Sequence, residues 1–174
     1  MDRIEQLRRV IDDILRKNLD PEESRCGFVH LYGVSAICTL LALKRGLDPG
    51  LCLAAGMLHD IWNYKFQDNP NHGQLGAIEA RKILEGLGSF SVDEVELIYT
   101  AIARHTDKES IDSVVDELLK DADVFQHYLY NPRMYRESIA NRAGSSTPFK
   151  SMREKRLERV LSELGINEQS SDPG

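Results

Sequence analysis

The chain of 174 residues has few cysteines, few aromatic residues and no excess of positive charge. Its three cysteines, Cys26, Cys38 and Cys52, are odd in number, form no Cys-x-x-Cys pair and have apolar neighbours. This pattern argues against a disulfide framework or a zinc knot and predicts reduced core residues. The formal net charge of -6 leaves no basic face suited to a nucleic-acid polymer.

Long apolar runs and segments of alternating polarity are also lacking. No run approaches the roughly 20 apolar residues that a bilayer-spanning helix needs, and the acidic N-terminus lacks the basic and apolar regions of a signal peptide. We therefore expect a cytoplasmic protein with no membrane partner. No segment alternates with a period of two residues, so strands are not expected.

Helical periodicity runs through most of the chain instead and predicts an all-α fold of about seven helices. The length suits one domain over residues 1–165, followed by a flexible polar tail over 166–174. Asp-Pro pairs and a Ser-x-x-Glu capping box mark several helix starts. The expected helices are one ending near Asn18, a short one from Pro21 to Gly27, and longer ones over 28–44, 49–60, 72–87, 92–105, 111–130 and 148–165.

The apolar run from Leu53 to Trp62 contains an unusual feature, the pair His59-Asp60 at the end of a helix. Residues 51–58 carry no charge, which predicts a helix surrounded by others. Burying an imidazole and a carboxylate there costs several kcal/mol unless a partner such as a bound cation satisfies them. The dipeptide alone is weak evidence, because roughly 0.4 His-Asp pairs are expected by chance.

Other histidines and aspartates fall at comparable places. Four of the five histidines lie at the start or end of expected helices, and most of these face apolar stripes. With two aspartates they form a nitrogen and oxygen ligand set that suits Mn, Fe, Co, Ni or Zn better than Ca. Such a set could hold one ion, or two ions with a bridging carboxylate. The candidate ligands are His30, His59, Asp60, His72, His105 and Asp123.

Five short motifs carry these residues in a particular order. They are FVHLYGV at 28–34, GMLHDI at 56–61, NHGQLGA at 71–77, IARH at 102–105 and KDAD at 120–123. This order resembles the HD-domain metal-dependent phosphohydrolases over residues 28 to about 130. The resemblance implies that His30, His59, Asp60 and Asp123 are the four primary metal ligands. It also implies that His72 and His105 bind a second ion, as in the dinuclear branches.

The resemblance implies hydrolysis of a phosphate ester or anhydride in a small phosphorylated metabolite or nucleotide. The ion, held with the catalytic pair His59 and Asp60, would lower the pKa of bound water from 15.7 toward about 7, and the resulting hydroxide would attack phosphorus. Lys65, Arg104 and Lys108 are candidates to hold phosphate oxygens, although each could equally be a solvated surface charge.

Several alternatives stay open on the sequence. The six-ligand pattern also resembles a branch of the superfamily whose di-iron site uses oxygen to cleave a C–C or C–P bond. The chain could alternatively be a non-catalytic module that binds a nucleotide, and it could form an oligomer. Trp62, Tyr64 and Phe66 are packing residues or one wall of a pocket. His127 matches none of the motifs and is expected to be structural.

Overall fold

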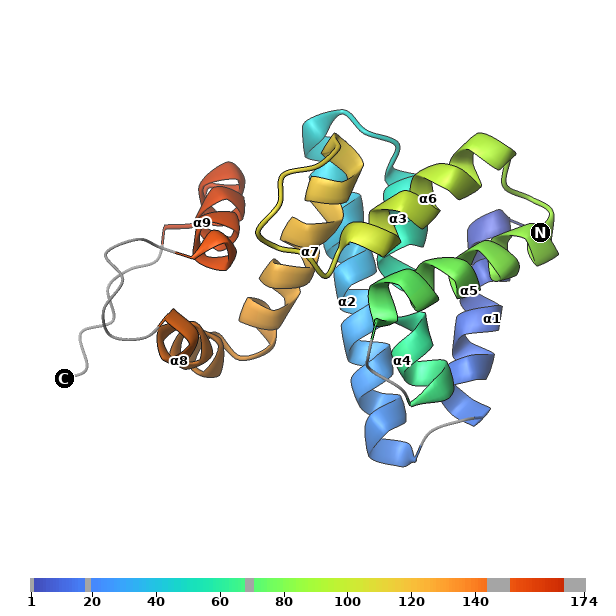
Figure 1. Ribbon diagram of the computed structural model, residues 1–174, viewed down its shortest axis with the longest axis horizontal. Coiled ribbons are helices and arrows are strands. Elements are labelled where there is room, and N and C mark those ends of the chain that lie inside the picture. The colour runs from blue at the N-terminus through green and yellow to red at the C-terminus, as the bar shows by residue number, and fades with distance from the viewer. Residues whose placement is uncertain (1, 18–19, 68–70, 144–150, 168–174) are drawn as a thin grey trace.

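The structure is a computed structural model that describes residues 2–17, 20–67, 71–143 and 151–167, without the side chains of residues 140–143. Within these ranges every regular element is a helix, which confirms the all-α fold class (Figure 1). Residues 168–174, most of the expected tail, lie outside the described ranges. The helices are α1 (Arg3–Lys17), α2 (Pro21–Arg45), α3 (Pro49–Leu58), α4 (Ile61–Phe66), α5 (His72–Leu87), α6 (Val92–Arg104), α7 (Val114–Tyr130), α8 (Pro132–Ala143) and α9 (Met152–Leu164).

Helix starts follow the capping signals in the sequence. The Asp20 side chain accepts hydrogen bonds from two backbone N–H groups of α2, and Asp48 does the same for α3. Ser91 and Glu94 form the expected reciprocal capping box at the start of α6. These caps fix where the helices that carry the candidate ligands begin.

Four features of the helix pattern differ from the expectation. Helix α2 runs through Gly27, where a Cβ would lie 2.6 Å from a Leu15 side-chain carbon, so this glycine allows α1 to approach closely and does not end the helix. Helices α4 and α8 were not expected as separate elements. Ile111 precedes α7, which begins after its N-cap Ser113. Helix α9 begins after Ser151, whereas the expected cap at 147–148 lies outside the described residues.

Helix α2 is the central element, and it packs most extensively against α3 and α7 (Figure 1). The approach of α3 is close at Gly56, where a Cβ would lie only 2.8 Å from the Ser35 Cα. Buried apolar side chains of these three helices, among them Leu31, Met57 and Leu118, form the core. The packing brings the end of α3, and with it His59, against the turn of α2 that carries His30.

Helix α2 is also apolar over a longer stretch than the sequence reading allowed. By length and composition alone its 25 residues could cross a membrane. Half of its most apolar window is buried inside the protein, and one such helix is weak evidence for a membrane span. Its central position accounts for the buried half.

Candidate metal centre

The centre begins where α2 and α3 meet. His30 comes from α2, and His59 is the residue at which α3 ends. Their Nε2 atoms lie 3.1 Å apart. Asp60, in the bend between α3 and α4, places its Oδ2 3.3 Å from His30 Nε2 and 3.5 Å from His59 Nε2. The bend therefore turns both members of the His-Asp pair toward α2.

Three of the histidine rings are held by hydrogen bonds through Nδ1. Each acceptor is a carbonyl oxygen, which cannot donate, so each Nδ1 carries a proton and, in the neutral ring, each Nε2 keeps a free lone pair. Such partners set the tautomer that a metal ligand needs. The acceptors are Gln126 Oε1 for His30, the Gly56 carbonyl for His59 and the Ile102 carbonyl for His105, at 2.8, 2.8 and 2.6 Å.

The second oxygen of Asp60 faces two further histidines. Its Oδ1 lies 3.3 Å from Nε2 of His105, at the end of α6, and 3.5 Å from Nε2 of His72, at the start of α5. This oxygen is buried and has no hydrogen-bond partner among the described residues. Asp60 thus lies between two histidine pairs, with one oxygen toward each, as a carboxylate that bridges two ions would.

Asp123 is supplied by α7, which packs against both α2 and α3. Its Oδ1 lies 3.7 Å from His30 Nε2 and 3.8 Å from His59 Nε2, and this buried oxygen also has no hydrogen-bond partner within the described ranges. Its Oδ2 lies 2.6 Å from the ammonium of the buried Lys108. The structure thus brings together all six candidate ligands from five different parts of the chain.

The donor set fits divalent cations. Bonds of about 2.1 Å place neighbouring ligand atoms about 3.0 Å apart in octahedral geometry and about 3.4 Å apart in tetrahedral geometry. The distances given above between neighbouring candidate ligand atoms range from 3.1 to 3.8 Å. The unpartnered oxygens of Asp60 and Asp123 are buried acceptors that a cation would satisfy. His30, His59, Asp60 and Asp123 would hold one ion, and Asp60, His72 and His105 a second.

The protonation states of His59, Asp60 and Asp123 suit metal ligands. His30 differs: burial would lower its pKa, but the hydrogen bond to Asp60 and the charges of Asp123 and Asp60 raise it. Complete burial lowers the pKa of His59 to about 3, so its ring is neutral. Burial alone would raise the pKa of Asp60, but positive charge on His59 and hydrogen bonds from His105 and His30, when these rings are protonated, hold it well below its ordinary value. Burial would also raise the pKa of Asp123, but the Lys108 ammonium holds this pKa well below its ordinary value. Neutral imidazoles and ionised carboxylates are the forms that bind metal.

The three candidate phosphate-binding cations differ in their surroundings. Lys65 pairs with the buried carboxylate of Glu79, and the half-exposed Arg104 lies 3.0 Å from Asp116. Lys108 is only 4% exposed, and its ammonium donates to the His105 carbonyl as well as pairing with Asp123. Of the three, only Lys108 has a contact with the centre, and its role toward a substrate remains a prediction.

A cavity of about 250 Å³ opens beside the centre. His30 and Asp60 form part of its wall, so a molecule in the cavity would touch the ligand cluster. Tyr64 lines the cavity, whereas Trp62 and Phe66 pack on each other with ring centroids 4.2 Å apart. The other lining residues are Cys26, Val29, Gln126, His127 and Tyr130.

Two of the residues that line this cavity were not identified as site residues from the sequence. Gln126 orients His30, and His127 lies 3.3 Å from Asp123 Oδ1. Both follow Asp123 on α7 by about one helical turn, so the signal was the i+4 spacing between a candidate ligand and a histidine. The expectation that His127 is structural stays untested, and the residue lies in the wall of the cavity.

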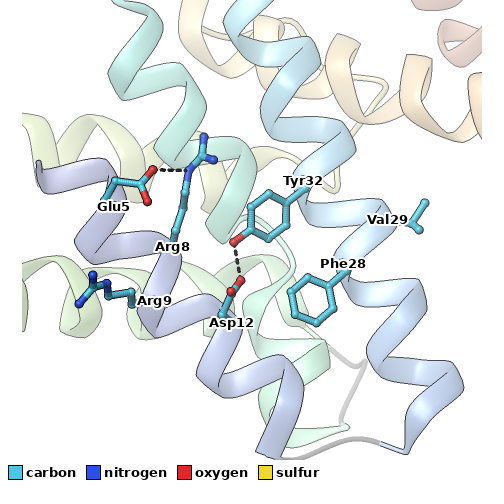
Figure 2. A pocket seen from close by; sticks show the side chains of 7 residues that line it. All are labelled: Glu5, Arg8, Arg9, Asp12, Phe28, Val29 and Tyr32. Carbon is cyan, nitrogen blue, oxygen red and sulfur yellow. Dashed lines mark hydrogen bonds and ion pairs between the residues drawn. The ribbon is translucent and has the colours of Figure 1, made fainter.

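A larger hollow, of about 570 Å³, lies elsewhere, between α1 and α2. Figure 2 shows four of its polar groups engaged in pairs, Tyr32 donating to Asp12 and Arg8 paired with Glu5. None of the six candidate ligands lines it. Its size therefore does not make it the functional site.

Comparison with known proteins agrees with this geometry. The sequence model of the HD domain matches residues 27–128, more than half of the chain. A solved structure, that of a predicted HD superfamily hydrolase from an uncultured Thermotogales bacterium, has a similar fold with a TM-score of 0.60 at 21% identity, covering 95% of this chain and 96% of that one. No curated protein matches. The chain belongs to the HD domain family.

Proposed function

We propose that this protein hydrolyses a phosphate ester or anhydride bond in a small phosphorylated metabolite or nucleotide, using one or two divalent ions of Mn, Fe, Co, Ni or Zn. The observation that carries the proposal is the position of Asp60, whose two oxygens each face a pair of imidazole nitrogens at 3.3–3.5 Å. Membership of the HD domain family supports the same class of chemistry.

Some groups in the chain would bind the ion, and others hold those ligands in position. His30, His59, Asp60 and Asp123 supply one ligand set, and His72 and His105 extend it. When bound, a divalent ion acts as a Lewis acid toward a phosphoryl oxygen and lowers the pKa of a coordinated water. Hydrogen bonds to backbone carbonyls hold His59 and His105 in place before substrate arrives, so little reorganisation is needed during the reaction.

The cavity supports a small anionic substrate. Its volume of about 250 Å³ lies below the usual range for drug-sized ligands, and Val29, Tyr64 and Tyr130 give it apolar walls. The chain as a whole carries a net charge of -6 and would repel an anion. Positive charge at the centre, from the ions and the Lys108 ammonium, would recruit the phosphoryl group locally.

A screen of nucleotides and sugar phosphates tests this proposal. The purified chain, stripped of metal and reloaded with Mn, Co, Ni or Fe, should release inorganic phosphate from at least one compound, and a chelator should abolish the release. The Asp60→Asn variant, which keeps the shape of the side chain, is the matched control and should be inactive. A panel that is silent with every metal would reject hydrolysis.

One observation also favours a second candidate function. The position of Asp60 between two histidine pairs suits a dinuclear site, which an oxygenase with two irons also requires. Such an enzyme would consume oxygen with a polyol or phosphonate substrate, whereas a hydrolase works under anaerobic conditions. Oxygen uptake measured with the di-iron protein, combined with a silent phosphate screen, would establish this alternative.

A further inference from the structure

His127 lies one helical turn after Asp123 on α7, at the edge of the centre. Its Nε2 is 3.3 Å from Asp123 Oδ1, and its ring centroid is 4.9 Å from that of His30. Ligand atoms of His30, Asp123 and His127 all lie within 4.8 Å of one another. This set of two imidazoles and one carboxylate shares only His30 with the set formed by His30, His59 and Asp60.

The surroundings of His127 differ from those of a structural histidine. Its side chain is 51% exposed and lines the cavity, so burial does not hold it in place. It forms an ion-pair contact with Asp123 Oδ1, a buried oxygen that makes no hydrogen bond of regular geometry in the described parts of the chain. The Asp123 side chain itself is only 10% exposed. A cation shared by the two side chains would satisfy that oxygen.

We propose that His127 is a further metal ligand, binding through Nε2 the ion that Asp123 Oδ1 and His30 also hold. His30 can bind only one ion, because its Nδ1 donates to Gln126 and only its Nε2 is free. The ion that His127 reaches is therefore the one that His30, His59, Asp60 and Asp123 hold. His127 raises the number of protein ligands on this ion from four to five and faces the cavity.

Five protein ligands have a consequence for the choice of metal. Zinc prefers four ligands in tetrahedral geometry, whereas Mn, Fe, Co and Ni accept five or six. A site completed by His127 therefore selects one of the latter ions over zinc. Removing His127 should lower that preference, because four protein ligands remain.

Metal binding without substrate tests the proposal. The full-length chain and its His127→Ala variant are stripped of metal and titrated with Co²⁺ by calorimetry, and the visible spectrum of the bound cobalt is recorded. We expect His127→Ala to weaken binding at one site by at least tenfold and to intensify the cobalt bands, as the coordination number falls. Leu129→Ala, an exposed residue in the same turn of α7, is the control and should match the parent.

Two results would overturn the proposal. One is a His127→Ala protein that folds and binds Co²⁺ with the affinity and spectrum of the parent. The other comes from the unmodified chain, which is used in case the variant does not fold. Carbethoxylation of His127, mapped by mass spectrometry, should be suppressed by Co²⁺. Equal modification of His127 with and without Co²⁺ would exclude it as a ligand.

The proposal rests on the metal centre of the proposed function, but the two fail separately. Suppose that His127→Ala binds Co²⁺ more weakly than the parent and that the parent cleaves no phosphate ester. The hydrolase proposal then fails, and the proposal that His127 is a metal ligand is upheld. If phosphate is released and His127→Ala has the cobalt spectrum of the parent, the ligand proposal fails alone.

Discussion

The ammonium of Lys108 lies 2.6 Å from Asp123 Oδ2, in a pair that is almost completely buried. One oxygen of Asp123 is thereby engaged, so only Oδ1 is directed at His30 and His59. Asp123 can therefore give an ion one oxygen and not two. The pair itself carries no net charge, because the ammonium balances the Asp123 carboxylate.

This pair predicts opposite effects of one substitution. Lys108→Met should destabilise the metal-free protein by about 3 kcal/mol, because it leaves the buried Asp123 carboxylate without its partner. The same change should strengthen metal binding about tenfold, because a cation near the ion is removed. Chemical denaturation and calorimetric titration measure the two effects. Lys82→Met, at an exposed position, should change neither.

The second ion depends on His105. We expect up to two ions per chain in the loaded parent and about one in His105→Ala, because Asp60 Oδ1 would keep only His72 as a neighbouring imidazole. Elemental analysis after desalting gives the count. Asp93→Ala, at the exposed start of α6, is the control. Equal counts in the parent and in His105→Ala would make the site mononuclear and leave His105 with another role.

Arg156 joins α9 to the segment that carries Lys108. Its side chain is 1% exposed and donates to the carbonyls of Lys108 and Ser110 and to the carboxylates of Glu117 and Asp121. Arg156→Met should cost about 3–5 kcal/mol in the free energy of unfolding, because these buried acceptors lose their donor.

The neighbouring Arg159 offers a matched comparison for Arg156. It pairs with the same two carboxylates, but its side chain is 45% exposed. Arg159→Met should cost at most about 1 kcal/mol. Similar losses for the two variants in urea denaturation would contradict the structural role assigned to Arg156.

The same cluster predicts a pH dependence of stability. Burial opposes ionisation of Glu117, but the Arg156 guanidinium lowers its pKa from 4.5 to about 2. Because the folded-state pKa is depressed, the stabilisation is complete above pH 4.5 and is lost as the pH falls from 4.5 toward 2. We expect this loss to be about 3 kcal/mol in the parent and absent in Glu117→Gln, as measured by denaturation at a series of pH values.

The sequence predicted the fold class and the convergence of the ligands because both depend on local signals. Apolar stripes at helical spacing placed His30 and His105 on inward faces, and Asp-Pro pairs located the helix starts. The structure brings all six candidate ligands into one centre from those separate helices. Their role as ligands stays a prediction.

The parts that the sequence did not predict depend on tertiary contacts. Gly27 was read as an interruption, since glycine disfavours helix interiors by about 1 kcal/mol, but contact with Leu15 makes it suitable there. Pairing of Lys65 with Glu79 and of Arg104 with Asp116 involves partners that sequence spacing does not reveal. His127 matched no motif and was expected to be structural, and that expectation stays untested.

The proposed metal centre depends most on Asp60, the carboxylate between the two histidine pairs. The most direct measurement is the metal content and phosphate release of Asp60→Ala beside the parent, after both are loaded with Mn or Co and desalted. We predict that the variant retains no tightly bound ion and releases no phosphate from a compound that the parent hydrolyses. An Asp60→Ala protein with the metal content and the rate of the parent would contradict the central claim.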